Sequence, residues 1–165
     1  MANYDIEQYI DDFIVYLKPF LNTAITNINN DNGDTLLTTI SDDAFFYKKD
    51  SPQTKGSSQF YYYEPYTDVG IDEEGDLSGR YFRKAYQLEM GISFYNNNRE
   101  ADRDSNNNRR VMRYQKAFEE ALICVNGKLR KYGHLSLVSI KSSNETRDDN
   151  LLHISAFNVK FTMGG

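Results

Sequence analysis

The segment from Tyr86 to Val125 constrains the fold most, because its hydrophobic period changes once within it. In Tyr86–Tyr95 apolar residues alternate with polar or small ones, which predicts a strand with one covered face. From Arg109 onward the apolar side chains are three or four residues apart, which predicts an amphipathic helix. They are Val111, Tyr114, Phe118, Leu122 and Val125. We therefore expect this helix to end near Gly127, a favourable capping residue, and to pack on the apolar face of the strand.

An N-terminal helix is predicted over Tyr4–Lys18, where apolar side chains again recur at helical spacing. Asp5, or Asn3 before it, is suited to cap the start of this helix, and Pro19 predicts a stop or a kink. Further along, Asn32 and Gly33 form an Asn-Gly pair, which is a strong turn signal.

The C-terminal part predicts two strands. His134–Lys141 is the first, followed by a charged turn over Ser142–Asn150. In the last strand the apolar residues change parity between an upstream and a downstream set, which predicts a β-bulge near residues 155–157. The upstream set is Leu152, Ile154 and Ala156, and the downstream set is Phe157, Val159, Phe161 and Met163.

Two short aromatic runs, Phe45–Tyr47 and Phe60–Tyr63, flank a linker rich in Lys, Ser, Gly and Pro. They predict a hairpin with a long arm, so that about residues 44–80 form an extended hairpin or loop insertion. Consecutive aromatic residues on a strand point to both faces of the sheet, and we expect some of these rings to face solvent or a neighbouring molecule.

Residues 1–165 are expected to form one domain of the α/β (α+β) class. The predicted architecture is a mixed or mostly antiparallel sheet, with an N-terminal helix and one long central helix packed on it. The single cysteine, Cys124, precludes an internal disulfide, and its place beside the apolar stripe predicts a small buried hydrophobe. The chain lacks a secretion signal and a membrane span, so we expect a soluble protein of a reducing cytoplasm without a cofactor.

Charge is distributed unevenly along the chain. Residues 1–78 carry 15 acids and 4 bases, a net of −11, and residues 79–165 carry 9 acids and 15 bases, a net of +6. An acidic side and a basic side on one subunit would favour head-to-tail contacts between identical copies. The 13 tyrosines point the same way, since tyrosine is enriched where proteins meet.

Three arginines near the start of the predicted central helix are unfavourably placed for the helix macrodipole. Arg109, Arg110 and Arg113 lie where the helix macrodipole favours acids, at a cost of about 0.3–1 kcal/mol each. Three explanations remain open: a solvated face that tolerates this cost, a local interaction, or a partner surface that binds arginine through planar ion pairs. The acids available for a local interaction are Glu100, Asp102 and Asp104.

The sequence contains no Gly-rich phosphate loop, nucleophile elbow or zinc-binding Cys/His spacing, so we do not expect an enzyme. The acidic cluster over Asp72–Asp76 is interpreted as an exposed loop or an interface patch, because consecutive acids scatter their side chains instead of converging on a metal. The two histidines, His134 and His153, are interpreted as half-buried strand residues.

The order of elements, with the run from Tyr86 to Phe94 followed by Arg109 to Leu122, resembles that of the tail terminator (tail completion) proteins of long-tailed bacteriophages. This resemblance implies a structural virion protein, assembled in the host cytoplasm as a ring, typically a hexamer. The ring would cap the tail tube, contact the tail tube protein and the head-completion or connector protein, and let DNA pass through its lumen. No chemical step and no membrane is implied.

Within this resemblance, we expect an acidic loop of one copy to meet the basic set of the next. The acidic loop comprises Asp72, Glu73, Glu74 and Asp76, and the basic set comprises Arg109, Arg110 and Arg113. The hairpin arm is expected to reach a ring above or below through Lys48, Lys49, Lys55, Tyr61 and Tyr63. The alternatives are another neck ring, such as a head-completion or adaptor protein, a monomeric regulatory domain, and a small metal-dependent hydrolase that would use Asp72, Glu73, Asp76 and one histidine.

Overall fold

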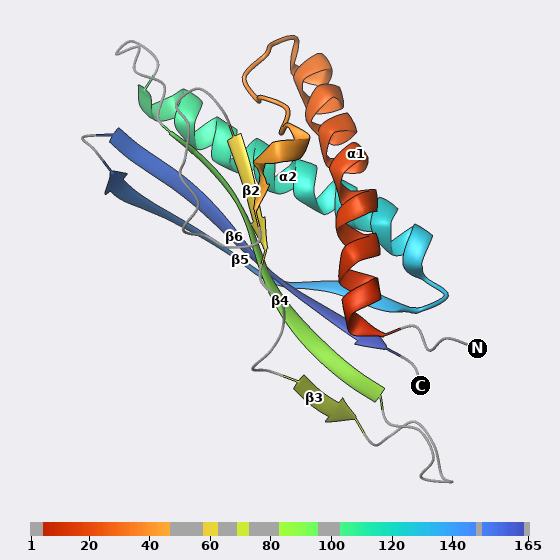
Figure 1. Cartoon of the computed structure of the whole chain (residues 1–165). Helices are drawn as coiled ribbons and strands as arrows, with labels where there is room; N and C mark the ends of the chain where they lie inside the picture. Colours follow the sequence, from red (N-terminus) through yellow and green to blue (C-terminus); the bar gives the residue numbers. More distant parts are fainter. Residues whose placement is uncertain are drawn as a thin grey trace, which may run out of the picture.

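The computed structural model describes residues 5–46, 58–62, 69–72, 83–95, 103–147 and 150–163. In these residues, two long helices cover one face of a six-stranded sheet (Figure 1). The helices are α1 (Ile6–Asn32) and α2 (Arg103–Leu129), with a short 3-10 turn at Asp42–Ala44. The strands are β1 (Phe45–Phe46), β2 (Ser58–Tyr62), β3 (Val69–Asp72), β4 (Arg83–Tyr95), β5 (Gly133–Arg147) and β6 (Asn150–Met163). The α+β class, with an N-terminal and a central helix on the sheet, is confirmed.

The long strand β4 lies at the centre of the sheet, whose order is β1-β2-β4-β6-β5. One edge of β4 pairs with β6, and its other edge pairs with β2 over residues 90–94 and with β3 over residues 83–86. All these pairs are antiparallel, but β1 and β2 run parallel, with Phe45 opposite Phe60. The predicted hairpin is therefore wrong for these two strands, since a hairpin joins antiparallel neighbours.

The helix-facing side of β4 carries its apolar residues, as predicted. Tyr86, Leu88, Met90, Ile92 and Phe94 are each buried to 8% exposure or less. Both helices contribute aromatic rings to this core. Phe118 of α2 stacks on Phe157 of β6 with ring centroids 4.0 Å apart, and Tyr9 of α1 stacks on Phe161 at 3.9 Å. These contacts place both helices over β6.

Helix α1 is longer than predicted. Asp5 caps it as expected, because its Oδ1 accepts the Gln8 N–H at 3.0 Å. Pro19 lies inside the helix instead of ending it. The helix continues because the next turns bury four more apolar residues, Leu21, Ala24, Ile25 and Ile28, which outweighs one lost backbone hydrogen bond. It ends at the predicted Asn-Gly pair, where Gly33 adopts φ 65° as the C-cap.

Helix α2 also differs from its predicted bounds at both ends. It begins at Arg103, so part of the segment between Tyr95 and Arg109 is helical. Gly127 lies within the helix and does not cap it. Leu129, at 1% exposure, shows why the helix continues, since its last turn places one more apolar side chain in the core.

The last two strands pair over their whole length, which corrects two predictions. β5 runs to Arg147, so the turn expected over residues 142–150 is mostly strand, because ladder pairing with β6 overrides the polar side chains. β6 pairs with β4 in one register throughout, and the irregularity lies instead in β5, between Leu137 and Ser139. The parity change in β6 arises because Leu152 and Ile154 face the opposite side of the sheet, where they pack with Tyr61. No helix in the described segments is long and apolar enough to cross a membrane.

Candidate interaction surface

Arg113 of the predicted basic set forms an ion pair within the chain. Its Nη1 lies 2.8 Å from Oδ2 of Asp34, which directly follows the cap of α1. This hydrogen bond, supported by the Leu36 N–H and the charge of Arg109, holds the pKa of Asp34 below its usual range. The pair joins the end of α1 to α2.

Arg110 is also engaged within the subunit. Its guanidinium lies over the Phe94 ring, 4.5 Å from the centroid, and its Nη1 donates to the Tyr95 carbonyl at 3.5 Å. His153 stacks on the same Phe94 ring with centroids 5.2 Å apart. Burial lowers the pKa of His153, and the nearby charge of Arg110 lowers it further. These contacts explain an arginine at this position without a partner molecule.

These contacts favour the local explanation of the arginine cluster. Because α2 begins at Arg103, Arg109 lies beyond its first turn, where the macrodipole has largely faded. The acid that Arg113 binds is Asp34, and Arg109 is the one member of the set that stays exposed. The side chains of Glu100, Asp102 and Asp104 lie outside the described part of the chain. Asp34 follows a turn signal in the sequence, but it is 79 residues from Arg113, so the sequence alone does not predict that the two side chains pair.

The other predicted contact residues separate into three groups. Asp72 is the last residue of β3, and its backbone lies opposite that of Arg83 in the ladder with β4. Tyr61 is 4% exposed, and its ring covers Gly91, so it does not face outward as the partner-contact prediction requires. The remaining ones, Lys48, Lys49, Lys55, Tyr63, Glu73, Glu74 and Asp76, lie outside the described residues.

The structure draws attention to a region that the sequence did not single out, the open edge of β5. This strand pairs with β6 on one side, and no described strand pairs with its other side. Oδ1 of Asn126 in α2 accepts the Leu135 N–H at 3.1 Å, so this N–H points away from β6. By the alternation of an antiparallel ladder, the backbone groups of Leu137, and of Ile140 beyond the irregularity, point outward too.

A shallow apolar groove of about 280 Å³ runs beside this edge, between β5 and α2. It is lined by Glu119, Leu122, Ile123, Asn126, Leu135 and Leu137. Ile123 is 73% exposed, and Val138 on the neighbouring strand is 54% exposed. We call the outward edge of residues 133–140, the groove and these two side chains the edge surface. Cys124, next to Ile123, is exposed too, so the prediction that it is buried is wrong.

Of the features that usually protect a strand edge, the edge surface has only the irregularity in β5 between Leu137 and Ser139. Natural sheets shield their edges with charged residues, proline, short strands or bulges. Residues 133–140 contain no Asp, Glu, Lys, Arg or Pro, and the first charged residue along β5 is Lys141. Only the irregularity near Val138 interrupts the edge. A long, uncharged edge beside exposed apolar side chains is suited to a protein partner.

The described residues contain no group of three or more His, Cys, Asp or Glu side chains placed to hold a metal ion. At the edge surface the chain presents strand backbone and apolar side chains. No protein-family model and no curated protein matched this sequence.

Proposed function

We propose that this protein is a structural subunit that assembles head to tail with identical copies into a ring. In the assembly that its layout resembles, the ring caps the tail tube of a long-tailed bacteriophage and joins the tail to the neck. The observation that carries this proposal is the edge surface, where a strand edge that no described strand pairs lies beside the exposed side chains of Ile123 and Val138. Covering such a surface with another chain lowers the free energy, because apolar area is buried and strand backbone is paired.

The topology of the sheet supports a head-to-tail contact. The strand β5 is at one end of the strand order, whereas β1 and β3 lie on the other side of β4. The two ends differ in length, sequence and charge. A contact between unlike surfaces leaves each copy with one unused surface of each kind, so assembly proceeds until a ring closes or a filament grows.

Because Arg113 forms an ion pair with Asp34, variants of the arginines are unsuitable for testing this proposal. Charge reversal of Arg110 and Arg113 would disrupt contacts within the chain, because Arg113 pairs with Asp34 and Arg110 lies over Phe94. A loss of assembly in that variant would not separate association from folding. Variants at the edge surface avoid this difficulty, because Ile123 and Val138 are exposed.

Electron microscopy of the protein mixed with assembling tail tube protein tests the function directly. We expect rings at tube ends and tubes that stop growing, and we expect Val138→Lys protein to leave the ends bare. Rings that bind only the head-side connector would show a different neck ring. Protein that stays unattached to both, with tubes of unchanged length, would overturn the proposal.

A further inference from the structure

We infer that α1 and α2 carry a binding site for an extended peptide, and that the chain closes this site with its own residues 34–40, which act as an autoinhibitory strap. The strap belongs to no helix or strand, and Figure 1 shows the chain turning back beside α1 on its way to β1. The partner is a segment of another protein with the same chemistry, an acid followed by two apolar residues at intervals of three. The inference goes beyond the proposed ring and does not depend on it.

Two asparagines of α1 hold the backbone of the strap. Asn29 binds both backbone groups of Leu37, because its Nδ2 donates to the carbonyl at 2.9 Å and its Oδ1 accepts the N–H at 3.1 Å. Asn22 binds both groups of Ile40 in the same way, at 2.7 and 2.8 Å. The two asparagines are two helical turns apart, or about 10.5 Å, which matches about 10 Å for three residues of extended chain. Helix α1 therefore presents two amides in register with an extended backbone.

Tyr114 of α2 holds the strap residue that follows Leu37. Its hydroxyl accepts the Thr38 N–H at 2.9 Å and donates to the Thr38 carbonyl at 3.2 Å. Since the hydroxyl has one proton, Ser58 of β2 is the donor in the hydrogen bond that it shares with Tyr114. Tyr114 is fully buried, so its hydroxyl is held in place. Side chains of the two helices thus bind six backbone groups of the strap, and such contacts bind an extended peptide independently of its sequence.

Three side chains of the strap, spaced three residues apart, give the site its sequence preference. Leu37 and Ile40 are 3% and 1% exposed and belong to the core, whereas the two threonines between them are exposed. Asp34 precedes Leu37 by three residues, and its carboxylate binds Arg113 at 2.8 Å. The site therefore selects an acid, an apolar residue three positions later and a second apolar residue three positions after that.

The strap can be exchanged without opening the sheet. The described backbone contacts of Leu37, Thr38 and Ile40 are made with helix side chains, and the ladders of the sheet include none of these residues. The strap starts after Gly33, whose φ of 65° turns the chain at the end of α1. A partner segment that makes the same contacts can replace it. Because the strap competes for the site, the intact chain binds such a segment weakly.

Fluorescence anisotropy with a labelled synthetic peptide of residues 34–42 tests the site. The peptide is added to the intact chain, to Ile40→Ala and to Leu37→Ser with Ile40→Ser, two variants in which the strap itself is weakened. We expect the peptide to bind each variant at least about tenfold more tightly than the intact chain, because less strap occupies the site. A control peptide carrying Leu37→Ser and Ile40→Ser should not bind. Circular dichroism identifies the folded variants, and the milder Ile40→Ala retains the test if the double variant unfolds. Equal affinity of the intact chain and the folded variants would overturn the inference.

Two matched changes locate the peptide on the helices. In the weakened-strap background, Asn22→Ala should lower the affinity at least about fivefold, because two hydrogen bonds are lost. Asn27→Ala, at an exposed asparagine of the same helix, should leave it within about twofold. Asp34→Lys in the peptide should lower the affinity by about two- to fivefold, and Arg113→Glu in the protein should restore it. Equal effects of Asn22→Ala and Asn27→Ala would overturn the inference, since the peptide would then bind elsewhere.

Discussion

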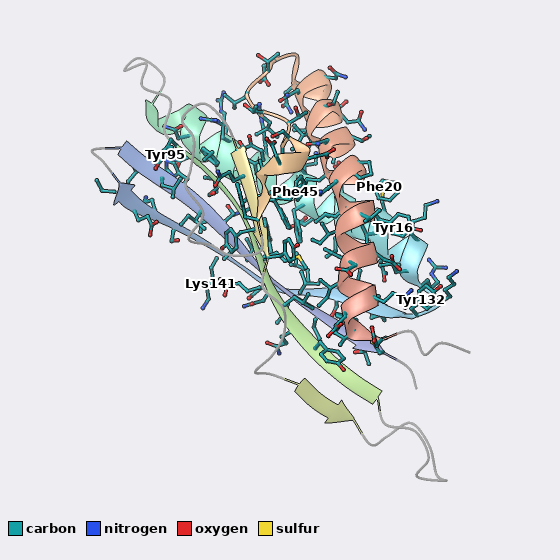
Figure 2. All side chains as sticks on the ribbon, in the orientation of Figure 1. Tyr16, Phe20, Phe45, Tyr95, Tyr132 and Lys141 are labelled. Carbon is teal, nitrogen blue, oxygen red and sulfur yellow. The ribbon has the colours of Figure 1, made fainter. Side chains whose placement is uncertain are left out.

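The subunit exposes apolar side chains in two regions that differ in the backbone beneath them. On α1, Val15 is 65% and Tyr16 is 37% exposed. The helix pairs its own backbone here except at the Val15 carbonyl, whose usual partner four residues on is Pro19, which has no N–H. Figure 2 shows Tyr16 on the side of α1 away from the sheet. At the edge surface, Ile123 and Val138 are exposed to a similar extent, but they flank strand backbone that no described strand pairs. Scattered exposed apolar residues are normal on a protein surface. For this reason the proposed contact lies at the edge of β5 that no described strand pairs, and not at the exposed side chains of α1.

The largest effect should separate the buried side of α2 from its side at the edge surface. Phe118→Ala removes a fully buried ring stacked on Phe157, and we expect it to lower the free energy of unfolding by about 3–5 kcal/mol. Ile123→Ala on the same helix should change it by less than about 0.5 kcal/mol in the monomer. Urea denaturation measures both. Similar losses in the two variants would show that Ile123 already stabilises the monomer.

A second change tests whether the outer face of β4 is closed while the edge of β5 is open. A Cβ at Gly91 would overlap the ring of Tyr61, which is 4% exposed. We expect Gly91→Ala to lower the free energy of unfolding by about 1–3 kcal/mol. In a Tyr61→Ala background most of this cost should vanish, because the clashing ring is absent. A double-mutant cycle by urea denaturation measures the coupling, and an unchanged cost would contradict this account.

A matched pair of valine substitutions compares the two exposed regions themselves. Val138→Lys places a charge beside the open edge and should weaken self-association by at least about tenfold, or about 1.4 kcal/mol. Val15→Lys makes the same change on α1 and should leave association within about twofold. Sedimentation equilibrium gives both constants. If Val15→Lys had the larger effect, α1 would be the contact region.

The smallest predicted effects are changes of stability with pH, and they arise from Asp34 and His153, which lie away from the edge surface. The folded pKa of Asp34 is below its unfolded value of about 3.9, so its contribution to stability is present above that pH and is lost as pH falls through the folded pKa. His153 also has a lowered pKa, so the folded state binds fewer protons and stability falls as pH drops from about 6.5 towards the folded pKa. Asp34→Asn should remove the acidic dependence, and His153→Gln the one near neutrality. Urea denaturation across pH measures both, and unchanged pH profiles would contradict these assignments.

The periodic parts of the fold could be predicted from the sequence because burial determines them locally. The alternation around Leu88 and Met90 and the helical spacing around Phe118 identify β4 and α2 and the faces they bury. The ends were less predictable. Local signals at Pro19 and Gly127 favour a break, but core packing of Ile25 and Leu129 carries each helix past it.

The candidate surface could not be predicted, because it depends on which strands become neighbours. The pattern around Leu135 and Leu137 predicts a strand but does not indicate that the strand lies at an edge. The pairing of Arg113 with Asp34 likewise depends on how α1 crosses α2. Charge counts along the chain suggested opposite patches, but part of that charge is neutralised within the subunit.

Amide hydrogen exchange, measured by mass spectrometry on dilute and on assembled protein, tests the central claim most directly. If copies join through the open edge, peptides covering residues 133–140 will gain protection on assembly, and peptides covering Val15 on α1 will not change. Protection gained over α1, with exchange along β5 unaltered, would contradict the account.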